Sequence, residues 1–155
     1  MNDHHVWDIE RSLQIQAGMV WRPLGRVSVN SSERLALPKA NRRPAIYCFR
    51  IRLGNGERRY VGETENLSRR FSHYVNPGPS QQTNIRLKQL MLEALHAGSE
   101  ISVSVVQDQA WIVWEGGQKE IDLNSKAARC LLENVAILEM DAIEVESLNR
   151  ASGNK

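Results

Sequence analysis

Residues 45–74 read AIYCFRIRLGNGERRYVGETENLSRRFSHY, and this stretch decides the fold that we expect. Residues 45–52 are rich in β-branched and aromatic side chains, which favour strands. The Gly-Asn-Gly sequence at 54–56 predicts a tight turn, because glycine and asparagine tolerate positive φ. Residues 58–61 then return as a second strand. The stretch therefore opens with an antiparallel hairpin.

A helix is expected directly after this hairpin. Thr64 or Asn66 can cap it by accepting a hydrogen bond from a free backbone N–H group. Arg70 precedes Tyr74 by one helical turn, so its side chain can share the edge of the helix's buried face. The apolar residues that recur at helical spacing and predict this face are Leu67, Phe71, Tyr74 and Val75.

The rest of the chain completes an α/β domain of the α+β type, in which a small, mainly antiparallel three-stranded sheet is flanked by helices. Residues 101–106 alternate apolar residues with serine and predict the third strand. Residues 111–114 and 118–123 predict an extra β-hairpin, joined by two glycines. A second helix is expected between a cap at Thr83 and a stop at Gly98.

A last long helix is expected to begin at Asn124 or Ser125. Its apolar residues that predict a buried face are Ala128, Leu131, Leu132, Val135 and Leu138. On the same helix Glu133 lies four residues after Arg129, a spacing that suits an ordinary ion pair between the two.

We divide the chain into an N-terminal extension at residues 1–44, one domain at 45–150 and a short tail at 151–155. Residues 6–15 predict either a short amphipathic helix or an extended arm, and residues 19–29 predict a strand broken by a proline and a glycine. Two roles are open for the extension. It can recognise a target or a second copy of the chain, or it can cover an exposed sheet edge.

The formal charge of +2 hides an uneven distribution. Between Lys39 and Lys88 the chain carries eleven Lys or Arg against three Glu, a net charge of +8, whereas the other residues carry nine basic against fifteen acidic side chains. A local positive field attracts a polyanion more than the total charge suggests. Charge alone leaves a solvated surface and a nucleic-acid contact equally open.

The sequence has no apolar window long enough to span a membrane, and no signal peptide is recognisable at its start. Cys48 and Cys130 have no metal-ligand spacing with the histidines, and we expect them as buried, reduced thiols. We therefore expect a cytoplasmic protein without a membrane partner.

Several residues of the organising stretch together resemble the signature of the GIY-YIG nuclease superfamily. They are Ala45-Ile46-Tyr47, Tyr60-Val61-Gly62, Thr64, Leu67 and Arg70. The family has an arginine ten positions after the second tyrosine, where Arg70 stands. Ala45 replaces the family's first glycine, and Tyr74 stands where many members have a histidine. The resemblance covers about residues 45–149.

This resemblance implies a metal-dependent DNA endonuclease that hydrolyses phosphodiester bonds, of a restriction type. Its catalytic residues would be Tyr47, Tyr60, Arg70, Tyr74 and Glu133. Glu133 would bind Mg²⁺ or Mn²⁺, hard cations that prefer oxygen ligands. Arg70 would grip a phosphate. Tyr47 is favoured as the general base, with its pKa lowered by nearby positive charge.

Double-stranded DNA is the expected partner, and a homodimer stays an open alternative to a monomer. The residues expected to contact DNA are Arg42, Arg43, Gly62, Arg69, His73, Arg86, Lys88 and Asn149. Two other functions are open. One is a nucleic-acid-binding module on the same fold that does not cleave. The other is a protein-interaction domain that uses the hairpin at 111–114.

Overall fold

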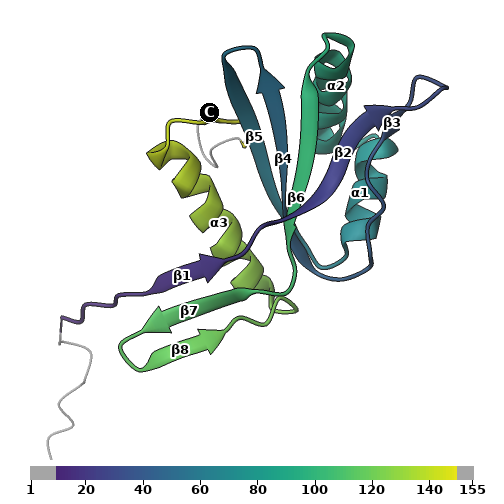
Figure 1. Ribbon diagram of the computed structural model, residues 1–155. Coiled ribbons are helices and arrows are strands. Elements are labelled where there is room, and N and C mark those ends of the chain that lie inside the picture. Colours follow the sequence, from purple (N-terminus) through teal and green to yellow (C-terminus); the bar gives the residue numbers. More distant parts are fainter. Residues whose placement is uncertain (1–9, 150–155) are drawn as a thin grey trace, which may run out of the picture.

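The computed structural model describes residues 10–149, which form two sheets and three helices (Figure 1). The strands are β1 (Gln16–Met19), β2 (Arg22–Val29), β3 (Leu35–Ala36), β4 (Ala45–Leu53), β5 (Gly56–Thr64), β6 (Glu100–Val106), β7 (Ala110–Trp114), β8 (Gly117–Glu120) and β9 (Glu146–Ser147). The helices are α1 (Leu67–Val75), α2 (Gln82–His96) and α3 (Lys126–Ala142). The predicted α+β class is confirmed.

The main sheet has the strand order β3-β2-β6-β4-β5-β9. Its centre is the predicted antiparallel arrangement, in which β4 pairs with both β5 and β6. The sheet is wider than the three strands expected, because the N-terminal segment adds β2 and β3 and the C-terminal segment adds β9. β2 pairs with the outer edge of β6, with a register shift between Pro23 and Gly25. The extension thus covers a sheet edge, as one of its two expected roles requires.

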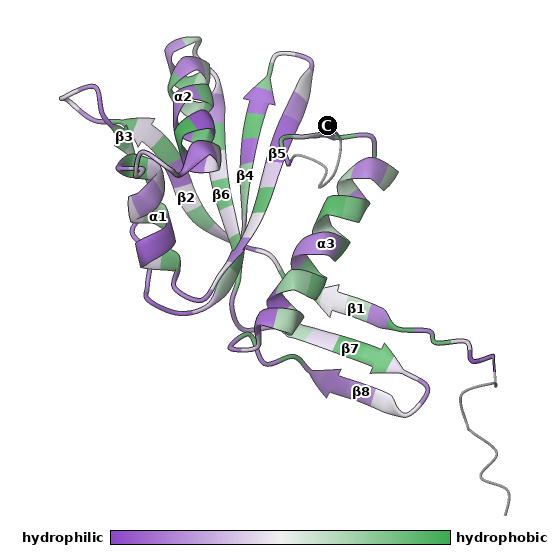
Figure 2. Cartoon of the chain, turned by 180° about the vertical axis from the view of Figure 1, so that it is seen from behind, coloured by the Kyte–Doolittle hydropathy of each residue, from purple (hydrophilic) through white to green (hydrophobic). Residues whose placement is uncertain are grey.

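The β4–β5 hairpin has the predicted two-residue turn, since Leu53 pairs with Gly56. Alternate residues of β4 point to opposite faces of the sheet, and two hydrophobic cores result. Tyr47 and Phe49 belong to the core under α1 and α2, whereas Ile46 belongs to the core under α3. Figures 1 and 2 show α3 on the other side of the sheet from α1 and α2.

The first two helices begin differently. Asn66 caps α1 and accepts a 3.0 Å hydrogen bond from the backbone N–H of Arg69, as predicted. Thr83 does not cap α2. The helix begins two residues earlier than such a cap would place it, at Gln82, and the side chain of its cap residue Gln81 makes no cap hydrogen bond. The Gln81 side chain instead accepts hydrogen bonds from the Gly78 backbone and the Asn84 amide.

Helix α3 begins at the predicted cap Ser125, but its buried face differs from the expected one. Leu131 and Leu138 are 39% and 66% exposed. The residues that face the sheet are Arg129, Leu132, Ala136 and Met140. The prediction was wrong because it considered only apolar residues, whereas the buried face begins with the basic residue Arg129. Arg129 belongs there because it has a half-buried acidic partner, Glu63, on β5.

A small second sheet, ordered β1-β7-β8, projects from the main one. It contains the predicted hairpin of β7 and β8. Trp111 lies against Gly18, where a Cβ atom would come within 2.4 Å of the indole ring. Both cysteines are half-buried free thiols rather than fully buried ones. Within residues 10–149, none of the helices is long and apolar enough to cross a membrane.

The corrected face of α3 can be tested with two neighbouring leucines. Leu132 is fully buried, so Leu132→Ala should lower the free energy of unfolding by about 2–5 kcal/mol, the usual cost of a cavity in a core. Leu131→Ala should change it by about 0.5 kcal/mol, because that side chain is already partly in water. Urea unfolding measures both. Equal losses would mean that the helix presents a different face to the sheet.

Candidate active site

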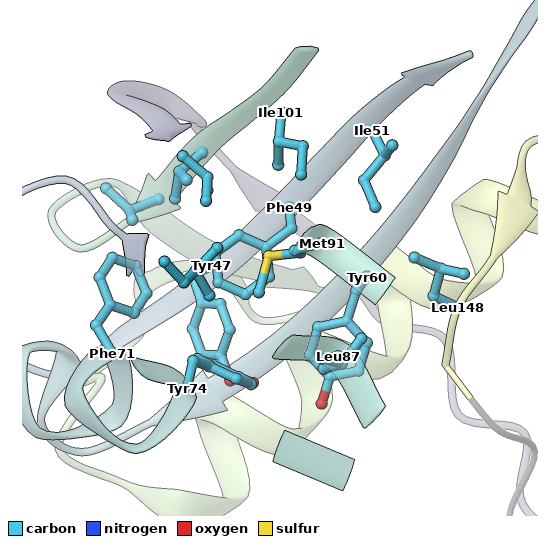
Figure 3. Close-up of a cluster of buried hydrophobic side chains, with 14 of the residues drawn as sticks. Tyr47, Phe49, Ile51, Tyr60, Phe71, Tyr74, Leu87, Met91, Ile101 and Leu148 are labelled. Carbon is cyan, nitrogen blue, oxygen red and sulfur yellow. The ribbon is translucent and has the colours of Figure 1, made fainter. Parts of the chain in front are cut away.

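The tyrosines of the organising stretch meet in one aromatic cluster between the β4–β5 hairpin and α1 (Figure 3). Tyr47 and Tyr74 are fully buried, and their rings pack edge to face with centroids 6.1 Å apart. Phe71 packs edge-on against Tyr47, and Phe49 stacks on Tyr60. Such pairs stabilise a core beyond the area that they bury. The cluster therefore gives the tyrosine hydroxyls fixed positions.

A short hydrogen-bond chain joins this cluster to Arg70 on α1. The Nε of Arg70 donates to the Tyr47 hydroxyl at 2.9 Å, and the Tyr47 and Tyr74 hydroxyls lie 2.7 Å apart. The Arg70 guanidinium also lies 5.3 Å from the centre of the Tyr74 ring. Within residues 10–149, the terminal nitrogens of Arg70 have no hydrogen-bond partner. They are therefore available to a ligand.

Arg70 lines a surface hollow together with residues 80–84, which we call the Arg70 hollow. These residues form the polar run at the start of α2, and they include the amides of Gln81 and Asn84. The hollow thus combines one half-buried cation with several hydrogen-bonding side chains. That chemistry suits an anion such as a phosphate.

Burial sets the protonation of the two inner tyrosines. It raises the pKa of Tyr47 well above its usual range, and the nearby Arg70 guanidinium lowers it only in part. Burial also raises the pKa of Tyr74. Arg70 thus lowers the pKa of Tyr47 as expected, but burial outweighs that effect and the net shift is upward. Both tyrosines stay protonated at neutral pH, and Tyr47 is poorly suited to act as a base.

Arg70 itself remains a cation in this setting. Burial is the largest single influence on the pKa of Arg70 and lowers it. The combined effect of Tyr47 and Tyr74 is to raise that pKa by more than burial lowers it, so the net shift is upward. Arg70 therefore places one permanent positive charge at the edge of the aromatic cluster.

Glycine is required at position 62 because the Tyr47 side chain occupies the space beside it. The two residues are paired across β4 and β5, and the Tyr47 ring lies over the glycine. A Cβ atom at position 62 would come within 2.3 Å of the Tyr47 hydroxyl oxygen. Since no side chain fits there, glycine is needed for space rather than for backbone conformation. Gly62 is among the residues expected to contact DNA, and in the structure it packs against Tyr47.

Glu133 lies on α3, half-buried, and has no ion pair or hydrogen bond with any residue from 10 to 149. The alternative that it pairs with Arg129 is excluded, because Arg129 binds Glu63 instead. Burial and the charge of Glu63 raise the pKa of Glu133, and the charges of Arg70 and Lys126 lower it. The charge of Arg70 thus acts on the pKa of Glu133 although α1 and α3 cover opposite faces of the sheet.

The ion pair between Arg129 and Glu63 is a feature that sequence reasoning missed. Arg129 is only 4% exposed, and its Nε donates to the Glu63 carboxylate at 2.6 Å. Its Nη1 donates to the backbone carbonyls of Leu123 and Asn124 at 2.9 and 3.0 Å. This network ties the start of α3 to β5 one turn before Glu133. The signal was there in principle, since Arg129 continues the spacing of the buried residues on α3.

Glu133 fits a hard divalent cation. It offers a half-buried carboxylate that no residue from 10 to 149 neutralises, and a bound cation would relieve the unfavourable burial that raises its pKa. No group of three His, Cys, Asp or Glu side chains gathers anywhere in residues 10–149. Magnesium is commonly held by one or two carboxylates together with water and phosphate oxygens, so a lone glutamate suffices as a protein ligand.

The residues expected to contact DNA fall into two groups. Arg43 and Arg69 are paired with Asp108 and Glu65, and Arg86 donates to the Leu148 carbonyl. Side chains without an ion pair or hydrogen bond within residues 10–149 are those of Arg42, His73 and Lys88. Two of these arginines are thus already paired with acids, Arg43 with one from outside the basic segment and Arg69 with one inside it.

Asn149 sits beside β5 at the end of the described chain. Its amide donates to the Val61 carbonyl at 2.7 Å and accepts from the Val61 N–H at 2.9 Å. It thereby extends the β9 pairing along the edge of β5. Its expected role in DNA contact stays a prediction, while its visible role is to hold the strand that carries Tyr60 and Gly62.

The fold is similar to that of a solved structure of bacteriophage T4 EndoII, in a glutamate-to-alanine variant. The TM-score is 0.53 at 18% sequence identity, and the match covers 84% of this chain and 92% of that one. No protein-family model matches the sequence, nor does any curated protein sequence. At this identity the likeness concerns the fold alone, so this chain shares the fold of that phage protein.

The protonation of Glu133 predicts how stability depends on pH. Because its pKa is raised in the folded state, the charged carboxylate destabilises the fold above that pKa, and this cost is absent below the unfolded pKa of about 4.3. With a chelator present, Glu133→Gln should therefore raise the urea midpoint at neutral pH and leave it unchanged in acid. Glu139→Gln, on an exposed position of the same helix, is the control. A destabilised Gln variant at neutral pH would mean that Glu133 has a stabilising partner.

Proposed function

We propose that this chain is a metal-dependent DNA endonuclease of the GIY-YIG type, which hydrolyses phosphodiester bonds in double-stranded DNA. The observation that carries the proposal is the arrangement of Arg70. Its Nε is fixed by a buried tyrosine, and its terminal nitrogens are free to meet a ligand in a polar hollow. The nuclease fold shared with EndoII supports it.

Arg70 would bind the scissile phosphate. A guanidinium has a planar fork of donors that matches two phosphate oxygens, and here one donor is already used to fix its orientation. A charge held in place before the substrate arrives stabilises the developing phosphoryl charge without rearranging during the reaction. The hydrogen bond to Tyr47 is therefore what turns a flexible side chain into a preorganised one.

Glu133 would hold one Mg²⁺ or Mn²⁺ near the same phosphate. When bound, such an ion supplies a Lewis acid that stabilises charge on the leaving oxygen. Glu133 and Arg70 already influence each other electrostatically, so a phosphate between them would meet positive charge from both sides once the ion is present. Arg129 and Glu63 would keep Glu133 in this position by fixing the start of α3.

The tyrosines would then divide into two roles. Tyr47 and Tyr74 stay protonated and buried, so they position Arg70. Tyr60 is 7% exposed, and its hydroxyl has no hydrogen-bond partner within residues 10–149. Figure 3 shows that hydroxyl directed away from the hydrophobic side chains, on the same side as those of Tyr47 and Tyr74. Tyr60 is therefore the better candidate to orient the attacking water.

One observation favours a second function, a DNA-binding module that does not cleave. Tyr47, the residue favoured as the base on sequence grounds, is buried and holds its proton firmly. If no other group accepts a proton from the water, the same surface would bind a phosphate without hydrolysing it. Measuring cleavage and binding on the same variants separates the two functions.

Cleavage should depend on both charges of the site. On supercoiled plasmid in Mg²⁺, Glu133→Gln should abolish nicking while DNA binding stays intact or tightens, because a negative charge near the phosphate is removed. Arg70→Ala should slow cleavage by about 10²–10³-fold, the usual loss for one preorganised charge stabiliser. The control is Arg26→Ala, an exposed arginine that is paired with Glu100 outside the site and should leave the rate unchanged. Parent-like cleavage by Glu133→Gln would show that the metal is held elsewhere.

DNA affinity should fall steeply with salt, because bound phosphates release their counterions. Arg42 and Lys88 have no ion pair within residues 10–149, so replacing both with alanine should flatten the slope of log K against log salt by about 0.9 for each phosphate that is no longer neutralised. Arg26→Ala removes one positive charge from the Arg26–Glu100 pair, outside the basic segment, and should leave the slope unchanged. Fluorescence anisotropy over a salt series gives both slopes. An affinity independent of salt would contradict electrostatic docking on this surface.

A further inference from the structure

The N-terminal segment carries a strand pattern that continues beyond the body of the protein. From Leu13 to Met19, every odd position is apolar and every even position is polar or glycine. This alternation is the signature of a strand with one buried face. The later members, Ala17 and Met19, pack against the core under α3. The earlier members, Leu13 and Ile15, are 69% and 51% exposed.

The pairing of β1 with β7 ends at Gln16, next to the exposed residues Leu13 and Ile15. The last paired residue of β1 is Gln16, opposite Val113, and the β7–β8 hairpin turns back after Trp114. Residues 10–15 therefore have no strand partner within residues 10–149, and Figure 1 shows them running on past β1. β1 is also an edge strand of its sheet, so no strand from residues 10–149 pairs with its other side. Such an edge is a template for another strand.

The apolar face of the small sheet continues onto this arm. At the inner end Ala110, the partner of Met19, is buried, whereas at the outer end Trp114 is 39% exposed. The register of β1 against β7 puts Ile15 on the same face as Trp114. Both lie beside a broad hollow lined by residues 11–16 and 113–115. The apolar face of the small sheet is therefore continuous, buried at the end with Met19 and Ala110 and exposed at the end with Ile15 and Trp114.

We propose that residues 10–18 pair with the same segment of a second copy of this chain and form a two-fold symmetric antiparallel strand pair. Around a two-fold axis at Gln14, Leu13 of one copy faces the partner's Ile15, and the reverse holds. All apolar side chains then lie on one face. Glu10 and Arg11 lie opposite Gly18 and Ala17 of the other copy, so no like charges meet.

The low charge of residues 10–16 argues against DNA as the partner that binds this segment. Residues 10–16 carry one Glu and one Arg, a net charge of zero, together with two exposed aliphatic side chains. A polyanion would gain little from such a surface. A strand with its own apolar face gains both backbone hydrogen bonds and burial. The self-pairing does not depend on the nuclease proposal, because it uses none of the residues of the candidate active site.

The test is the mass of the full chain in solution, measured by light scattering over a micromolar dilution series. We expect twice the monomer mass for the parent. Leu13→Gln with Ile15→Gln should weaken the dimer by about a hundredfold or more, because four apolar side chains are no longer there to be buried. The matched control exchanges polar residues on the other face, Ser12→Gln with Gln14→Ser, and should stay dimeric. Thermal melting should be unchanged in the diluted monomers, since neither face of the arm belongs to the core.

A cross-link locates the axis independently of affinity. Gln14→Cys should form an intermolecular disulfide under mild oxidation, because the proposal places the two copies of residue 14 opposite each other. The same change in the Leu13→Gln, Ile15→Gln background should cross-link far more slowly. A parent that stays monomeric throughout the series would overturn the proposal. So would a dimer that survives the double glutamine variant, because its interface would lie elsewhere.

Discussion

The hydrogen bond from Arg70 to the buried hydroxyl of Tyr47 is the interaction on which the candidate site depends. It crosses from helix α1 to strand β4, and it can form only because the Tyr47 ring fits over Gly62. Tyr74 supports it from the next turn of the helix, through a second hydroxyl and through its ring face. Together these interactions let a half-buried arginine keep its charge. A hydrogen-bonded cation in a dry cluster is a fixed electrostatic feature rather than a mobile surface charge.

Local features were predictable from the sequence because local chemistry decides them. The turn after Leu53 follows from glycine and asparagine, and the cap of α1 follows from an asparagine placed before an apolar helix. The joint spacing of Tyr47, Tyr60, Gly62 and Arg70 also implied a fold, and the solved structure of T4 EndoII shares the one observed.

Contacts between distant segments were not predictable in the same way. The width of the sheet depends on which strand residues 22–36 pair with, and nothing in their sequence predicts that this strand is β6. The buried face of α3 was misjudged because Arg129 looks like a surface residue until Glu63 is placed beside it. The basic segment looked more positive than it is, since Asp108 and Glu146 neutralise two of its arginines from outside. In each case the missing information was a partner far away in the chain.

Three consecutive residues at the end of β5 connect these observations. Gly62 leaves room for Tyr47 and so for the orientation of Arg70. Glu63 points to the other face, where it binds Arg129 and fixes the start of the helix that carries Glu133. Thr64 exchanges two 3.1 Å hydrogen bonds with the backbone of Asn66, the cap of α1. Because a strand alternates its faces, one short segment can place a cation from one side of the sheet and a carboxylate from the other. Arg70 and Glu133 therefore both depend on the end of β5, although they lie on helices that cover opposite faces of the sheet.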